Sequence, residues 1–148
     1  MRSLYDAIQL STSIDAQADS GGSAVDGAAI DTAGFNTAVL RVRVALSSGS
    51  PTTASTVVKL QECDTSDGTF TDALDNTGVA IGGTVNSKLA AGEVIARIEG
   101  LGTNRKKFLR ITETTTYTGG TTPATVVFGE IILGRAYTNP VNSAVSNT

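Results

Sequence analysis

The sequence predicts an all-β fold, a single-domain and jelly-roll-like β-sandwich of about seven to nine antiparallel strands. Short stretches rich in Val, Ile and Thr alternate with clusters of Gly, Ser, Asp and Thr along the chain. No segment keeps apolar residues at helical spacing. The 148 residues suit one hydrophobic core, which must be aliphatic because aromatic residues make up 5% and Trp is absent. We expect a sandwich domain over 1–136, including an N-terminal arm at 1–6, and a polar tail at 137–148.

Three strands are predicted in the first third of the chain. Residues 7–14 alternate Ile8, Leu10 and Thr12 against polar neighbours, and a Gly-Gly turn follows. Residues 24–31 form a weaker strand, because Asp26-Gly27 within it also fits a turn or a bulge. The clearest strand, 37–46, places one set of apolar side chains on a single face, namely Leu40, Val42, Val44 and Leu46.

The opposite face of strand 37–46 carries Arg41 and Arg43. These two cations are spaced to share one face, so they either pair with Glu99 or Glu62 on neighbouring strands or reach a partner subunit. The sequence leaves both alternatives open.

The middle of the chain predicts a hairpin. A strand over 55–64 is followed by the turn 64–69, whose Asp-Gly pair supplies the positive φ that a short hairpin requires. Phe70 and Leu74 are then expected to return the chain to the core. A short, glycine-broken strand over 79–85 follows.

Three further strands are predicted in the rest of the chain. Residues 92–100 alternate cleanly, and 105–117 form a long strand whose Thr-rich end we expect to be solvated. Residues 125–134 are apolar on both faces apart from Glu130, which is not typical of a surface strand. This last strand therefore lies centrally in a sheet or at a subunit interface.

The residue types present argue against an enzyme. The chain has no His, which removes the usual general base and zinc ligand, and its one cysteine, Cys63, excludes thiolate clusters. We interpret Cys63 as a small residue on a strand. The carboxylates at 64–75 lack the ligand spacing of a calcium loop and single out no catalytic pair. No cofactor or metal is expected, and a carboxylate hydrolase is the least favoured alternative.

Charge and hydropathy point away from nucleic acid and membranes. The formal net charge is −3 and the pI is about 4.8, so no overall positive field would attract DNA or an anionic membrane. No apolar run reaches the length of a spanning helix, and the first residues lack the apolar segment of a signal peptide. We expect synthesis in a bacterial cytoplasm.

One dense basic run stands out, formed by Arg105, Lys106 and Lys107. It fits a contact to an acidic protein surface or to phosphate. It equally fits a charged loop at the start of an exposed strand, where charge suppresses unwanted edge pairing.

Two segments, Val57–Phe70 and Lys107–Thr112, resemble virion proteins of tailed phages. In these proteins a strand ending in Leu-Gln leads into an Asp-rich hairpin, and a basic loop leads into a Phe-Leu-Arg strand. The last strand closes on Leu-Gly-Arg, here Leu133–Arg135, and the opening Leu4–Ala7 is also similar. The chain most resembles the jelly-roll cement proteins that decorate the capsids of short-tailed phages.

This resemblance implies a structural virion protein on the capsid exterior that stabilises contacts between major capsid subunits. Its partners would be the major capsid protein and itself, with a homodimer favoured and a trimer possible. Candidate interface residues are those of the two-faced strand, the arginine ladder and the basic run: Val126, Phe128, Ile132, Arg41, Arg43, Arg105, Lys106 and Lys107. The alternatives are a tail or baseplate component and a small carbohydrate-binding sandwich.

Overall fold

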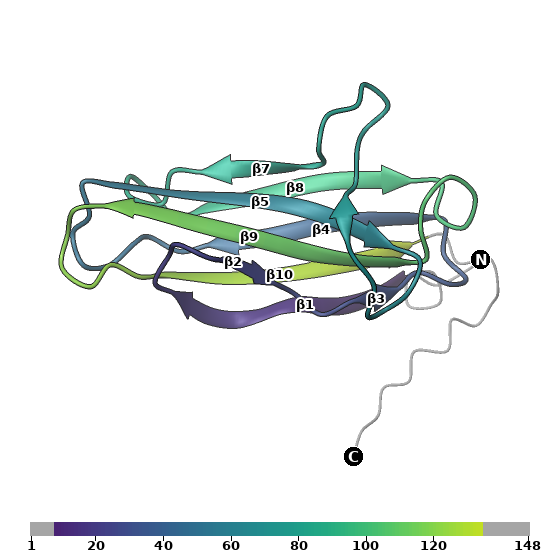
Figure 1. Cartoon of the computed structure of the whole chain (residues 1–148), viewed down its shortest axis with the longest axis horizontal. Helices are drawn as coiled ribbons and strands as arrows, with labels where there is room; N and C mark the ends of the chain where they lie inside the picture. Colours follow the sequence, from purple (N-terminus) through teal and green to yellow (C-terminus); the bar gives the residue numbers. More distant parts are fainter. Residues whose placement is uncertain (1–7, 135–148) are drawn as a thin grey trace, which may run out of the picture.

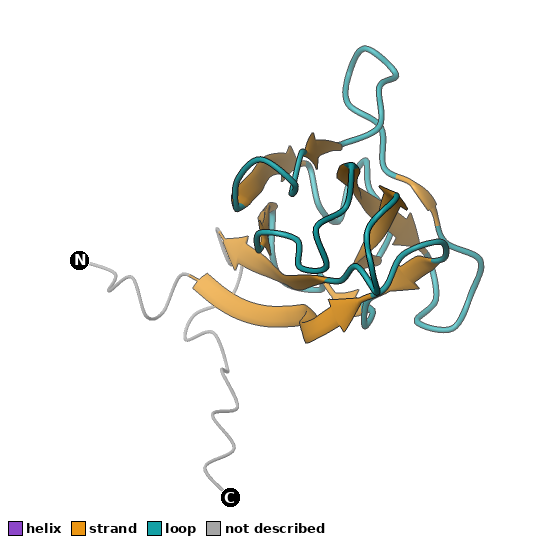
Figure 2. Ribbon diagram, turned by 90° about the vertical axis from the view of Figure 1, so that its left-hand side faces the viewer, coloured by secondary structure: helices purple, strands orange, loops and turns teal. Residues whose placement is uncertain are grey.

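The computed structural model describes residues 8–134, and these form a two-sheet β-sandwich (Figures 1 and 2). The predicted arm at 1–6 and tail at 137–148 lie outside the described residues. The strands run as β1 (Ile8–Asp19), β2 (Ala24–Asp26), β3 (Ile30–Asp31), β4 (Thr37–Val44), β5 (Thr53–Cys63), β6 (Thr71–Asp72), β7 (Gly82–Val85), β8 (Gly92–Glu99), β9 (Phe108–Thr118) and β10 (Thr125–Gly134). The predicted all-β sandwich is confirmed. No helix in this described part is long and apolar enough to cross a membrane.

The described residues form one four-stranded and one six-stranded sheet. The four-stranded sheet has the order β1-β10-β4-β8. The six-stranded sheet has the order β2-β9-β5-β6, with β3 also beside β9 and β7 also beside β5. All these pairings are antiparallel. Seen along the strands in Figure 2, the sheets lie face to face and enclose the core.

Alternation along the strands builds that core. In β4 each second side chain is buried, so Leu40, Val42 and Val44 face inward while Arg41 and Arg43 face outward, as predicted. Leu46 lies beyond the end of β4 and is 56% exposed, because the alternation stops where the strand stops. The buried apolar residues form one cluster drawn from both sheets, including Ile14, Leu60, Leu109, Ile111, Ile131 and Leu133.

The weak strand predicted at 24–31 is broken at Gly27 into β2 and β3. A side chain at Gly27 would lie 2.4 Å from the Ser13 hydroxyl, so the backbone can approach β1 this closely only with glycine. Ser13 uses that hydroxyl to link the sheets, accepting a hydrogen bond from the Ile111 amide (3.0 Å) and donating one to the Ala28 carbonyl (2.9 Å). The register of edge strand β1 shifts on both sides of Ile14, which disfavours edge-to-edge pairing there.

Three local expectations were wrong. The hairpin at 64–69 forms, but neither Asp67 nor Gly68 has the expected positive φ. Leu74 is 44% exposed, and the neighbouring Ala73 takes the buried position instead. The Thr-rich end of β9 was expected to be solvated, yet Thr115 and Glu113 are fully buried. They face the interior between the sheets, and only the outward positions of that segment, such as Thr116, meet water.

Candidate functional site: the outer face of the four-stranded sheet

β10 is the central feature of the four-stranded sheet, since it pairs with β1 on one side and β4 on the other. Its inward residues are buried, and its outward residues from 126 to 134 are exposed or half-buried. The prediction that this strand lies centrally in a sheet is confirmed. Its second apolar face looks outward.

The register brings outward residues of four strands into adjacent rows. Ile132 lies opposite Leu10 on β1 and Val39 on β4, which makes one apolar row across three strands. Glu130 lies opposite Arg41, which lies opposite Ile95 on β8. We call the outward side chains of β1, β10, β4 and β8 the outer face.

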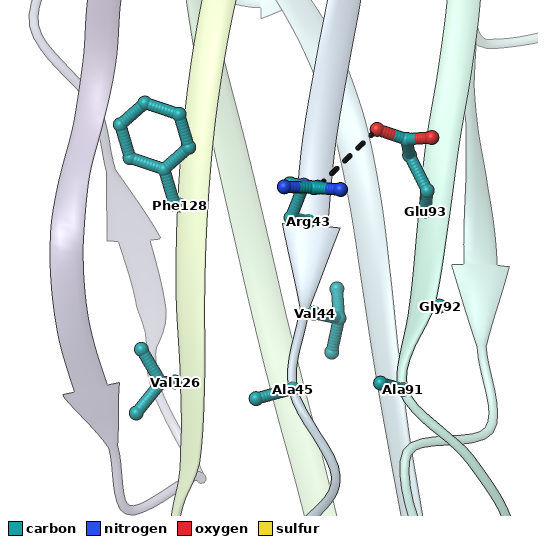
Figure 3. Close-up of a pocket in the computed structure, with 8 residues that line it drawn as sticks. All are labelled: Arg43, Val44, Ala45, Ala91, Gly92, Glu93, Val126 and Phe128. Atoms are coloured by element: carbon teal, nitrogen blue, oxygen red, sulfur yellow. Dashed lines mark ion pairs between the residues drawn. The ribbon is translucent and has the colours of Figure 1, made fainter.

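Large apolar side chains on the outer face remain accessible. Ile95 is 63% exposed, Leu10 61% and Val126 46%, and Phe128 is half-buried. At one end of the face Val126, Phe128, Arg43 and Glu93 line a shallow, open depression (Figure 3). Exposed aliphatic side chains gathered on one flat sheet mark a surface suited to contact with another protein.

The charges on this face are paired with one another. Arg41 Nε lies 2.6 Å from Glu93 Oε1, and its Nη1 lies 3.2 Å from Glu130 Oε1. The hydrogen bonds that Arg41 donates to Glu93 and then to Glu130 raise the pKa of its guanidinium, which stays charged. Arg43 Nε is 3.6 Å from the same Glu93 oxygen. Figure 3 marks this ion pair between Arg43 and Glu93. The predicted partners Glu99 and Glu62 are therefore wrong.

The order of the strands explains why Arg41 and Arg43 do not pair with Glu99 or Glu62. Glu99 is at the far end of β8 and pairs with Arg97, while Glu62 lies in the other sheet and faces Arg105. On β4, β8 and β10 the outer face thus carries three cations, Arg41, Arg43 and Arg97, against three anions, Glu93, Glu99 and Glu130.

The basic run lies elsewhere. Arg105 donates to the Leu74 carbonyl (2.6 Å) and lies 3.7 Å from Glu62, and Lys106 lies near Thr71 (3.3 Å). Lys107 is 3.5 Å from Asp31. All these contacts are with the six-stranded sheet and its loops. The structure therefore joins five of the eight candidate interface residues on one surface and places the basic run apart from them.

The outward side of the six-stranded sheet is polar and internally satisfied. Lys59 Nζ lies 2.6 Å from Asp72, which also accepts from Gln61 at 3.0 Å. Hydrogen bonds from Lys59 first and Gln61 second lower the pKa of Asp72. The guanidinium of Arg110 lies over one face of the Phe70 ring, 4.4 Å from its centroid.

Ile95, Val39 and Leu10 lie on the outer face but were not among the predicted interface residues. For Ile95 and Val39, the alternation in the sequence indicated the outward position. Ile95 lies between buried Val94 and partly buried Ala96, so its outward position follows from period two. Val39 alternates with Leu40 in the same way. Leu10 had no such signal, because the register shifts later in β1 decide which of its faces points outward.

The comparisons with known proteins assign no family. No family model and no curated protein matches the chain. Among solved structures, the chain is similar to SPBc2 prophage-derived protein YomS, with 16% identity over 84% of this chain and 92% of that chain and a TM-score of 0.42. A Clostridium thermocellum xylanase 10B with CBM22-1 and GH10 modules is 14% identical, with a TM-score of 0.45. The match covers 90% of this chain but only 27% of that one. A Desmodium yellow mottle tymovirus chain is 13% identical, with a TM-score of 0.32, over 88% of this chain and 86% of that one.

Proposed function

We propose that the chain is a non-enzymatic structural virion protein that binds the exterior of a phage capsid and stabilises contacts between major capsid subunits. The phage-like segments described above motivate the capsid as partner. The observation that carries a binding role is the outer face, where exposed Leu10, Ile95 and Val126 surround a set of mutually paired charges.

The pairing of charges matters for docking. A charge that leaves water without a partner destabilises a complex by several kcal/mol, about 3–5 when a buried pair loses one member. Arg41 and Arg43 already compensate Glu93 and Glu130 in the free protein, so a partner can cover these four groups without supplying opposite charges. The apolar side chains around them then supply the favourable free energy of binding, at about 25 cal/mol for each Å² removed from water.

Binding of this kind would stabilise the capsid by mass action. A protein that binds the assembled lattice, and not its free subunits, shifts the equilibrium towards the lattice. We further propose that the chain acts as a homodimer, which sedimentation of the free protein tests against a monomer or trimer.

Electron microscopy of purified virions tests the location, and density for the chain on the capsid exterior is the expected result. Density in the tail, or absence from particles, would refute the proposal. A matched pair of variants then tests the surface. Val126→Lys introduces a charge on the outer face, whereas Val57→Lys does so on the other sheet at similar exposure, 46% against 39%.

We expect Val126→Lys to weaken binding to chain-free capsids at least about tenfold, because about 1.4 kcal/mol of lost contact suffices for that factor. Val57→Lys should bind like the unmodified chain. The reverse result, with only Val57→Lys impaired, would place the contact on the six-stranded sheet.

A further inference from the structure

Two carboxyl groups are buried together at one end of the sandwich. Glu113 projects inward from β9 and is 1% exposed, and Asp19 at the end of β1 is 8% exposed. Glu113 Oε1 and Asp19 Oδ2 are both inaccessible to water and have no hydrogen-bond donor if both groups are ionised. Leaving two buried anions face to face is unfavourable, so something must compensate them.

The other two carboxylate oxygens already have donors. Asp19 Oδ1 accepts a hydrogen bond from the Gly21 amide at 2.8 Å, and Glu113 Oε2 accepts one from the Thr115 hydroxyl at 3.1 Å. Glu113 has only a hydroxyl donor and lies deeper in the interior, so it is the member of the pair that takes up a proton.

No cation compensates the pair within residues 8–134, where neither carboxylate takes part in a salt bridge. The titratable groups acting in this cluster are Asp19 from β1 and Tyr117 from β9. The residues opposite Glu113 in the register, Val25 on β2 and Val58 on β5, carry no charge. Thr125 contributes a hydroxyl from β10.

We propose that Glu113 and Asp19 form a carboxyl–carboxylate pair that shares one proton between Oε1 and Oδ2, and that release of this proton loosens this end of the sandwich. The proton moves from the Glu113 carboxylic acid to water and leaves two carboxylates in contact. A proton also needs no additional space, whereas Ca²⁺ takes six to eight oxygen ligands.

The titration of Glu113 sets the pH range over which this end of the sandwich loses stability. Burial first, and the charge and hydrogen bonding of Asp19 after it, raise the pKa of Glu113 from 4.5 to about 7. The folded protein therefore retains a proton that the unfolded chain releases. The stabilisation is complete below pH 4.5 and is lost as the pH rises through about 7.

The turn after β1 is the segment most directly affected. The Gly21 amide bonds to Asp19 itself, the Gly22 amide donates to the Thr115 carbonyl at 3.1 Å, and the Tyr117 hydroxyl lies 2.9 Å from the Asp19 carbonyl. Repulsion between the carboxylates pushes β1 away from β9, and the bonds to Thr115 and Tyr117 join β9 to this segment.

Glu113→Gln tests the proposal, because a glutamine of the same shape can donate its amide hydrogen to Asp19 Oδ2 at every pH. The folding equilibrium constant of the variant is compared with that of the original chain by urea unfolding between pH 4.5 and 8.5. A shift from 4.5 to about 7 predicts that the ratio of the two constants rises by about 150-fold in the variant's favour between pH 4.5 and 8.5, since half of the unfolded chains have already released this proton at pH 4.5. A ratio that stays constant across this range would overturn the proposal.

Three further measurements test whether the pH dependence comes from the Glu113–Asp19 pair. Glu99→Gln on the exposed end of β8 controls for loss of a negative charge, and its ratio should stay flat. Asp19→Asn should also remove the pH step, since its amide donates to Glu113 Oε1, and this variant serves if Glu113→Gln does not fold. At pH 8 the Gly21 and Gly22 amides should exchange hydrogen faster in the original chain than in Glu113→Gln, and equally fast at pH 5.

A carboxylic-acid carbonyl band in the infrared difference between original chain and Glu113→Gln should be present at pH 6 and absent at pH 8.5. Absence of that band at pH 6 would show that no proton is held. Recovery of stability at pH 8 on addition of Ca²⁺ alone, seen in the original chain but not in Glu113→Gln, would assign the site to a cation and refute proton sharing.

Discussion

Two adjacent isoleucines on β10 allow the same substitution to test the fold at one position and the proposed contact at the other. Ile131 faces the core and is 0% exposed, whereas Ile132 is half-buried on the outer face between Leu10 and Val39. Replacement by alanine removes the three carbon atoms beyond Cβ in both cases. At about 0.8 kcal/mol for each buried carbon the transfer term is about 2.4 kcal/mol for Ile131, and the cavity left behind raises the loss to about 3–4 kcal/mol.

Ile132→Ala opens no enclosed cavity and starts from a half-exposed side chain, so its loss of stability should stay below about 1.5 kcal/mol. Urea unfolding at constant pH measures both values, and the denaturant dependence should be the same for the two variants. Capsid binding should show the opposite order, with Ile132→Ala weakened and folded Ile131→Ala unchanged. Equal destabilisation by the two substitutions would refute the assignment of opposite faces.

Two further predictions concern polar groups. Tyr117→Phe should lower the free energy of unfolding by about 1–2 kcal/mol, measured by thermal or urea unfolding. The reason is that Thr125 Oγ1, at 2.8 Å, and the Asp19 carbonyl, at 2.9 Å, both lose the tyrosine hydroxyl as a hydrogen-bond partner. Unchanged stability would show that water replaces this hydroxyl. Asp72→Asn should flatten the acid limb of the stability profile, since hydrogen bonds from Lys59 and Gln61 lower the pKa of Asp72 and make its contribution present above pH 3.8 and lost below it. An acid limb identical to that of the original chain would contradict this.

Much of the fold follows from local alternation. Period two assigns the inner and outer residues of β4 and β8, and the two apolar faces of 125–134 indicate a strand with neighbours on both sides. Alternation does not specify which strands pair, so the sequence left Glu99, Glu62 and a partner subunit as alternative contacts of Arg41 and Arg43. The pairing of β4 with β8 places Glu93, not Glu99, opposite Arg43.

Burial of polar residues was harder to predict than burial of apolar ones. Thr has high β propensity and is usually exposed, so the run 112–118 gave no indication that Thr115 and Glu113 face inward. They are buried because β9 continues its alternation after the apolar residues end, which places polar side chains between the sheets. A chain of hydrogen-bonded hydroxyls from Ser87 through Ser47 to Thr125 lies at this end of the interior.

Packing within the sandwich does not account for the outward residues of β10. A central strand needs apolar side chains on its inner face, and Val127, Ile131 and Leu133 supply them with complete burial. Val126 remains 46% exposed on the other face and Phe128 half-buried, so neither gains full burial from the folded chain alone. Polar residues there would cost the isolated domain little, whereas apolar ones gain more only when a second surface covers them. Substitutions on the outer face should therefore reduce binding more than stability, and substitutions on the inner face should do the reverse.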